Sequence, residues 1–186
     1  MRKDYEIILN LIPENSKVLD IGCSDGELIT YLENKGISAQ GVELNQEKVI
    51  KCLEKGLDVI HGDINLIVED FPFNQFDYCL LTQTIQAVQE PDQLLNTLKK
   101  VSKNIIVSFN NSARLSKISN FLLTGSFDSL LKKANSDHWY NTDYIHPCSI
   151  KDFKKLATDL DLKIISTFDV LSQKKFENGK IPSNLF

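Results

Sequence analysis

Val18-Leu19-Asp20-Ile21-Gly22-Cys23-Ser24-Asp25-Gly26 is the stretch that decides the fold, because an apolar strand passes directly into a turn that contains two glycines. Glycines at such a turn let the backbone bend sharply and let a ligand approach the main chain. Leu28, Ile29 and Leu32 then lie on one side of a helix that Gly36 ends. Strand, turn and helix together predict the first unit of an α/β fold.

The alternation of strand and helix continues on both sides of this loop. A helix precedes it, with Tyr5, Ile8, Leu9 and Ile12 on one face, and Pro13 ends that helix. Strands are expected at 17–21, 38–43, 58–61, 76–81 and 104–109, and further helices begin near Asn45, Asp63 and Pro91. Apolar strands alternating with helices predict a Rossmann-like, doubly wound, mainly parallel sheet with helices on both faces.

The region from 110 to 147 departs from this rhythm. Leu115, Ile118 and Leu122 have helical spacing, and Gly125 interrupts the pattern. Within a single domain that spans 1–186, we expect this region to form a helical insertion or lid over the carboxyl edge of the sheet, where substrates bind. Ser149-Ile150-Lys151-Asp152 then resembles a capping box that opens another helix, and 162–170 is expected to form a further strand.

Composition excludes several classes of protein. The net charge of −4 gives no basic field for nucleic acid or an anionic membrane. No apolar run is long enough to span a bilayer, and the first residues lack the apolar core of a signal peptide, so we expect a cytoplasmic protein. The four cysteines form no C-x-x-C pair, so no metal site is expected, and Cys52 and Cys79 are interpreted as core residues.

Carboxylates around the loop indicate which ligand it binds. Glu43 ends the second strand about 20 residues beyond the loop, the place from which a carboxylate reaches ribose hydroxyls. The loop lacks the G-x-G-x-x-G pattern of dinucleotide sites, and the acids Asp20, Asp25 and Glu27 would repel a pyrophosphate. S-adenosylmethionine has no phosphate and carries two cationic groups, so the loop favours it over NAD.

Longer stretches carry a family resemblance. The segment 18–26 resembles the first motif of class I methyltransferases, which a very large superfamily shares. The segment 78–88, which contains Thr-Gln-Thr-Ile-Gln-Ala-Val, is more specific and is similar to the MetW family of methionine biosynthesis. The segments 139–142 and 145–153 are similar to the same family, so the resemblance spans nearly the whole chain.

The resemblance implies a site for S-adenosylmethionine or S-adenosylhomocysteine. It places the glycine loop around the methionine part of the cofactor, Glu43 on the ribose and Leu44 over the adenine. Asp63 would bond the adenine amino group, and Thr82 and Gln83 would close the site. The residues assigned to the cofactor are, in chain order, Asp20, Gly22, Cys23, Ser24, Gly26, Glu43, Leu44, Asp63, Ile64, Thr82 and Gln83.

Two departures from the family pattern stand out. Ser24 replaces the central glycine of the usual Gly-x-Gly-x-Gly loop, and its side chain adds bulk beside the cofactor. The family also continues beyond a sequence like Asn184-Leu185-Phe186 into a last strand, which this chain lacks. The absence of that strand would leave unpaired sheet edges. A truncated chain, a partial gene product and a rearranged sheet are the alternatives.

Catalysis is not decided by the sequence. A base near the methyl group would come from His138, Tyr140 or His146, although such residues in loops often only bond the backbone. The resemblance implies a protein that supports or regulates homoserine O-acyltransferase as its partner. The alternatives are a methyltransferase that acts on a small-molecule acceptor and, against the acidity of the loop, a nicotinamide oxidoreductase.

Overall fold

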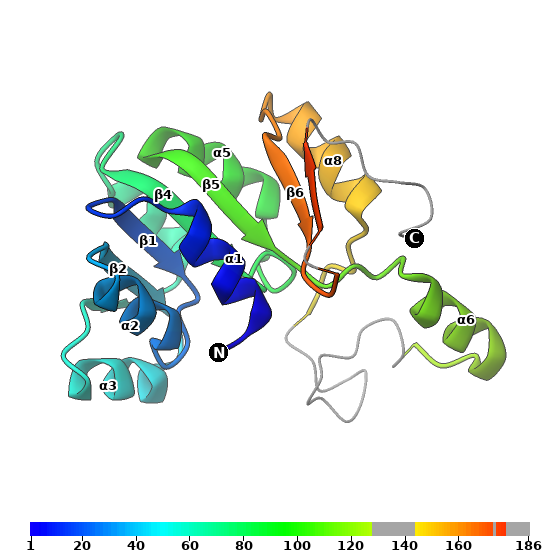
Figure 1. The fold of residues 1–186 in the computed structure, drawn as a ribbon, viewed down its shortest axis with the longest axis horizontal. Coiled ribbons are helices and arrows are strands. Elements are labelled where there is room, and N and C mark those ends of the chain that lie inside the picture. The colour runs from blue at the N-terminus through cyan, green and yellow to red at the C-terminus, as the bar shows by residue number, and fades with distance from the viewer. Residues whose placement is uncertain (128–143, 173, 178–186) are drawn as a thin grey trace. The chain divides into compact units, whose positions relative to one another are not determined.

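The computed structural model describes residues 1–127, 144–172 and 174–177 (Figure 1). These residues form two compact units. The first unit comprises Met1–Ile85 and Glu90–Ser108, and the second comprises Gln86–Gln89 and the described residues from Phe109 onward. Each unit is described by itself.

The first unit contains the predicted parallel sheet. Its strands are β1 (Lys17–Ile21), β2 (Ser38–Glu43), β3 (Val59–His61), β4 (Phe76–Thr82) and β5 (Ser102–Ser108). They pair in the order β3-β2-β1-β4-β5, and every pairing is parallel. This is the Rossmann-like α/β arrangement expected from the sequence, with β1 in the centre and the carboxyl ends of all five strands along one edge.

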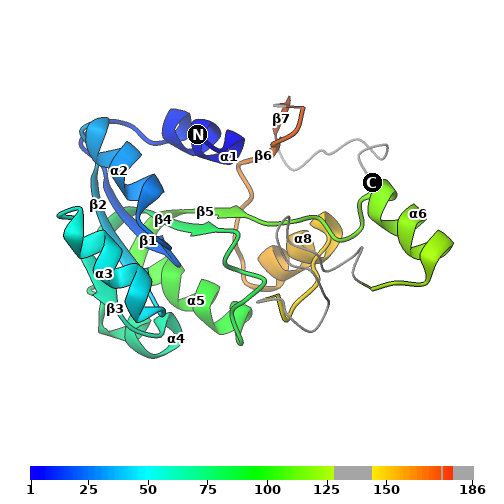
Figure 2. The same cartoon turned by 90° about the horizontal axis from the view of Figure 1, so that it is seen from below.

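Helices cover both faces of this sheet (Figures 1 and 2). On one face, α1 (Lys3–Leu11), α2 (Glu27–Asn34) and α3 (Gln46–Glu54) share a core with Val18 and Leu80 of the strands. On the other face lies α5 (Pro91–Val101), whose apolar side is fully buried. A short α4 (Ile64–Ile67) and a 3-10 turn (Val68–Asp70) follow β3. Cys52 and Cys79 are buried in these cores, as expected.

The second unit contains α6 (Leu115–Thr124), α8 (Ile150–Asp159) and an antiparallel pair, β6 (Ser166–Asp169) with β7 (Lys174–Glu177). The predicted capping box is confirmed, since Asp152 N–H donates to Ser149 Oγ at 3.1 Å and Ser149 N–H donates to Asp152 Oδ2 at 3.0 Å. The strand expected at 162–170 spans only Ser166–Asp169, and Leu162 N–H bonds Ala157 O at the end of α8.

Gln86 organises the middle of the second unit. Its fully buried side chain accepts from Asn110 N–H at 3.0 Å and donates to the carbonyl oxygens of Asn110 and His146. Its own carbonyl accepts from Ile145 N–H and His146 N–H. Part of the predicted lid, 128–143, lies outside the described residues, and a lid over the sheet edge stays a prediction. No helix among the described residues is long and apolar enough to cross a membrane.

Candidate functional site

Four neighbouring strands bring predicted site residues to the carboxyl edge of the sheet. Asp20 lies near the end of β1, Glu43 ends β2, Asp63 follows β3 and Thr82 ends β4. The parallel register aligns these ends, with Ile21 opposite both Val42 and Leu81. Ligands of open α/β sheets bind outside this edge, so these residues lie at the expected edge, and their roles in binding stay predictions.

The loop from Gly22 to Gly26 is held in a left-handed turn. Gly22 has φ 72°, Ser24 has φ 55° and Gly26 has φ 77°, a region that favours glycine. A Cβ on Gly22 would lie 2.7 Å from Thr84 Oγ1, so the loop also packs closely against the segment after β4. Ser24 therefore holds a left-handed conformation that glycine adopts without strain, at a backbone cost of roughly 1–2 kcal/mol.

The backbone N–H groups of this loop bond to the protein itself. Gly22 N–H and Cys23 N–H donate to Val42 O at 2.8 and 3.2 Å, and Gly26 N–H donates to Cys23 O. Ser24 N–H donates to Glu43 Oε2 at 2.8 Å. A phosphate cradle requires free N–H groups that point at the anion. The N–H groups of Gly22, Cys23, Ser24 and Gly26 are therefore already engaged within the protein, which leaves these four unavailable to an anion.

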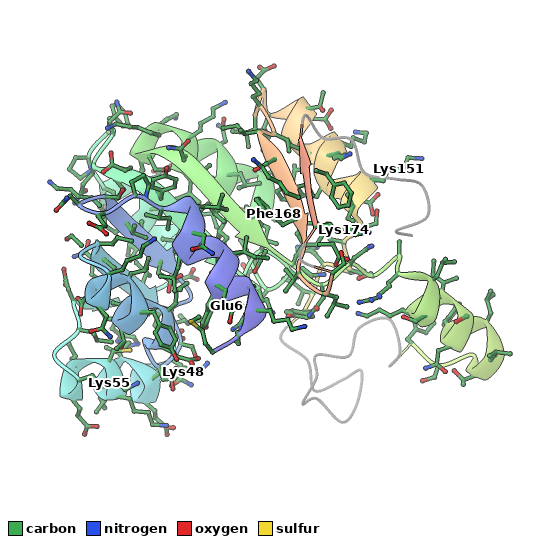
Figure 3. The ribbon with its side chains drawn as sticks, viewed as in Figure 1. Glu6, Lys48, Lys55, Lys151, Phe168 and Lys174 are labelled. Atoms are coloured by element: carbon green, nitrogen blue, oxygen red, sulfur yellow. The ribbon has the colours of Figure 1, made fainter. Side chains whose placement is uncertain are left out.

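Lys55 lies close to Asp25, one of the loop acids. Its Nζ lies 4.0 Å from Asp25 Oδ2 and donates to Asp25 O at 2.5 Å from the end of α3 (Figure 3). Asp25 is also exposed to solvent. The two carboxylates that lie buried beside the loop are Asp20 and Glu43.

Glu43 uses both carboxylate oxygens within the protein. Oε2 accepts from Ser24 N–H, and Oε1 accepts from Asn45 N–H at 2.9 Å. These bonds fix the carboxylate between the glycine loop and the start of α3. Each carboxylate oxygen has two acceptor positions, so Glu43 retains capacity for two hydroxyl donors such as a ribose offers.

Asp20 is almost completely buried, at 2% exposure, and its Oδ1 has no hydrogen-bond partner among the described residues. Burial raises the pKa of this carboxyl group to about 7. The nearby Arg2 charge opposes that rise, and the Glu43 charge adds to it. Buried polar atoms are normally paired, and an unpaired one is costly. A buried carboxyl group with an unpaired oxygen suits a ligand that carries a cationic hydrogen-bond donor.

The adenine-side candidates lie at the ends of β2 and β3. Leu44 is 66% exposed, and its carbonyl accepts from His61 Nε2 at 3.0 Å. His61 thus has a structural role, linking the two strand ends. Asp63 caps α4 by accepting from Asn65 N–H and Asn65 Nδ2 through Oδ1, and Ile64 beside it is buried.

Thr82 and Gln83 stand where β4 leaves the sheet. Thr82 Oγ1 is buried without a partner among the described residues. Gln83 has φ 58°, and its N–H donates to Ser108 O at 2.9 Å. Thr84 Oγ1 donates to Ile21 O at 3.0 Å, so this turn is tied directly to the end of β1. The arrangement brings Thr82 and Gln83 to the same edge as Asp20.

Sequence reasoning missed Arg2. The Arg2 guanidinium lies 4.4 Å from the Tyr5 ring centroid and is paired with the buried Asp4. Burial raises the pKa of Tyr5 to about 12, although the Arg2 charge opposes that rise. The only signal in the sequence is the apolar face of α1, which predicts packing and does not predict a charged group near Asp20.

The predicted catalytic candidates gain little support. His138 and Tyr140 lie outside the described residues. In the second unit, His146 donates its backbone N–H to Gln86 O, and its Nε2 lies 3.1 Å from Gln89 O, the backbone role that such residues often have. Among the described residues, no group of three or more His, Cys, Asp or Glu side chains is arranged to hold a metal ion.

Comparisons with known proteins identify relatives. The family model described as "Methionine biosynthesis protein MetW" matches residues 2–186. The bifunctional methionine biosynthesis protein MetXA/MetW of Rhodopirellula baltica is 32% identical over 170 residues, covering 87% of this chain and 27% of the relative. The chain therefore spans about a quarter of the length of that relative.

Solved structures share the fold at low sequence identity. A SAM-dependent methyltransferase from Archaeoglobus fulgidus has a TM-score of 0.65 and 19% identity, covering 89% of this chain and 73% of that one. A second SAM-dependent methyltransferase, from Methanosarcina mazei, has a TM-score of 0.64 and 18% identity. The match covers 88% of this chain and 85% of that one. The [4+2]-cyclase SpnF has a TM-score of 0.66 and 18% identity, and the match covers 92% of this chain and 60% of SpnF. These likenesses show the class I methyltransferase fold and do not show an activity.

Proposed function

The chain belongs to the MetW family of methionine biosynthesis proteins, and from this premise we propose that it binds S-adenosylmethionine or S-adenosylhomocysteine at the β1 loop and supports homoserine O-acyltransferase as a partner. Asp20 would receive the amino-acid end of the cofactor and Glu43 the ribose. Leu44 and Asp63 would contact the adenine. When bound, S-adenosylmethionine supplies an electrophilic methyl group on a cationic sulfonium.

One observation carries the cofactor proposal. The loop combines internally bonded N–H groups with an orphaned, buried Asp20 and a fixed Glu43. That donor and acceptor set disfavours a pyrophosphate and suits a cationic nucleoside. The fold of the solved relatives, several of which are named SAM-dependent methyltransferases, supports the same ligand.

The partner proposal rests on the family and on one relative. The name of the Rhodopirellula baltica protein joins MetXA, which we identify with homoserine O-acyltransferase, to MetW in a single chain. Two functions that occur in one polypeptide are held at high effective concentration. A separate MetW chain would need a binding surface to achieve the same association.

Isothermal titration with S-adenosylhomocysteine tests the cofactor site. Glu43→Gln places an amide where Ser24 N–H or Asn45 N–H now donates, so we expect at least a tenfold loss of affinity. Glu47→Gln, an exposed position on α3, is the matched control and should bind like the wild type. Equal affinity in both variants, or no binding by folded wild-type protein, would contradict the proposed site.

Co-expression with the homoserine O-acyltransferase of the same organism tests the partner. We expect the two proteins to co-purify through gel filtration as one complex, and acyltransferase activity to rise when this chain is present. Glu43→Gln should still co-purify if cofactor binding and partner binding use different surfaces. Separate elution with unchanged acyltransferase activity would refute the supporting role and favour a methyltransferase that acts on a small-molecule acceptor.

A further inference from the structure

Arg2 is the N-cap residue of α1, the first helix of the chain. In Figure 1, α1 and β1 run in roughly opposite directions, so the amino-terminal end of α1 points toward the edge of the sheet where β1 ends. Tyr5 anchors this end by entering the core that also contains Cys23 and Leu28. Arg2 lies three residues before Tyr5, at this anchored end of α1.

A chain of side-chain contacts connects Arg2 to the start of α2. Arg2 lies over the Tyr5 ring, the Tyr5 ring contacts the Tyr31 ring at 6.3 Å, and Tyr31 Oη donates to Glu27 Oε1 at 3.2 Å. Glu27 is the first residue of α2, directly after the loop. The positive charge of Arg2 also acts on both Asp20 and Glu27.

The Arg2 guanidinium uses only some of its N–H donors within the protein. Nε and Nη2 donate to the two oxygens of Asp4 at 3.1 and 2.5 Å, and Nη1 donates to Tyr5 Oη at 3.0 Å. Arginine has five N–H groups, so two of them, one on Nη1 and one on Nη2, have no partner among the described residues. The Arg2 side chain is 40% exposed, so this remaining edge can receive a ligand.

A second carboxylate fits this edge. Asp4 already fixes the plane of the guanidinium, and planar pairs of N–H groups are the usual partner of a carboxylate. Asp20 nearby offers the complementary group, a buried carboxylate oxygen without a partner among the described residues. An acid and a guanidinium group within electrostatic range of each other match the ammonium and the carboxylate of an α-amino acid.

We propose that Arg2 binds the α-carboxylate of S-adenosylmethionine or S-adenosylhomocysteine while Asp20 binds the α-ammonium group. This inference rests on the proposed cofactor site and deepens it, because it gives the site selectivity for nucleosides that carry a complete amino-acid end. Adenine nucleosides without that carboxylate would lose the contact with Arg2 and bind more weakly.

Titration with S-adenosylmethionine and decarboxylated S-adenosylmethionine tests the inference, since the two ligands differ only in the carboxylate. Wild-type protein should prefer S-adenosylmethionine by about 10- to 100-fold, the range of a charge-assisted hydrogen-bonded pair. Arg2→Met should lose that preference by weakening S-adenosylmethionine alone. Arg2→Lys should keep part of the preference, and Lys3→Met, at the exposed first position of α1, should behave like wild type.

Three other outcomes are distinguishable. Equal weakening of both ligands by Arg2→Met would mean that Arg2 only holds α1 in place, and the inference would be wrong. An undiminished preference in Arg2→Met would place the carboxylate elsewhere and would also overturn it. Failure of folded wild-type protein to bind either ligand would overturn the proposed cofactor site itself, and this inference with it.

Discussion

Asp20 and Glu43 show how two buried carboxylates on neighbouring strands acquire different properties. Glu43 accepts two backbone N–H groups, which stabilise its charge. Asp20 Oδ1 has no such donor among the described residues, and burial raises the pKa of Asp20 to about 7. A carboxyl group whose pKa rises on folding makes the folded state less stable as pH increases from its unfolded pKa, near 4, through about 7.

We therefore expect Asp20→Asn to stabilise the ligand-free protein above pH 7 and to have little effect near pH 4. The expected difference in the free energy of unfolding is on the order of 2–4 kcal/mol, because a tenfold change in an acid dissociation constant corresponds to about 1.4 kcal/mol. Urea denaturation of both proteins at pH 4.5, 6 and 8 measures it. A stability difference that stays constant across this range would show that Asp20 ionises normally.

Ligand binding should depend on pH in the opposite sense. The ionised form of Asp20 attracts an ammonium group, so wild-type affinity for S-adenosylhomocysteine should rise by up to about tenfold from pH 5.5 to 7, where an α-amino group is still mostly protonated. Titration calorimetry at the two pH values tests this, with Asp20→Asn as a variant that binds weakly at both. A flat wild-type profile would contradict the role of Asp20.

At the scale of elements, the β1 loop and the turn after β4 form one packed unit. Gly22 leaves no room for a side chain against Thr84, whereas a Cβ on Gly36, at a similar φ of 75°, would meet nothing within 4 Å. Gly22→Ala should therefore cost about 2–4 kcal/mol, from backbone strain plus overpacking, and Gly36→Ala only about 1 kcal/mol. Thermal or urea unfolding compares them.

A double variant isolates the contact. Thr84→Ala removes the two closest atoms, so part of the cost of Gly22→Ala should be recovered when both changes are combined. Equal costs for Gly22→Ala and Gly36→Ala would show that only backbone conformation matters at Gly22.

The elements of the first unit could be predicted because their signals are local. Apolar strands, helix caps and glycine stops occur within a few residues of one another, and Asn45 and Pro91 begin helices as expected. β7 could not be predicted, since Lys174-Lys175-Phe176-Glu177 has one apolar residue and depends on its partner β6. Gln86 looks like an ordinary loop residue in the sequence, and only the fold shows it bonding Asn110 and His146.

The candidate site could be predicted only in part. Asp20 and Glu43 follow from the position of a loop and a strand end along the chain. The difference between them depends on which backbone N–H groups meet each carboxylate in three dimensions. Arg2 depends on the packing of α1, since the contacts that place it run through Tyr5 and Tyr31 to Glu27.

For the whole molecule, the division into two compact units predicts where a ligand acts. The described cofactor candidates all lie in the first unit, whereas α8 lies in the second. At 100 times its Kd, S-adenosylhomocysteine should raise the free energy of global opening by about 2.7 kcal/mol for the unit that binds it. Hydrogen exchange measured by mass spectrometry should therefore slow in peptides covering 17–26 and 38–45 and stay unchanged in peptides covering 150–159.

Glu43→Gln provides the control, because a tenfold weaker affinity at the same ligand concentration should reduce the gain in opening free energy to about 1.4 kcal/mol in 17–26 and 38–45 and leave 150–159 unchanged. Equal slowing of hydrogen exchange in 150–159 would contradict the separate opening of the two units. It would mean that residues 1–186 unfold together as the single domain that the sequence predicts, since amides far from the ligand gain protection only through a shared opening reaction. Slowing confined to 150–159 would instead place the ligand in the second unit and remove the physical basis for assigning it to Asp20 and Glu43.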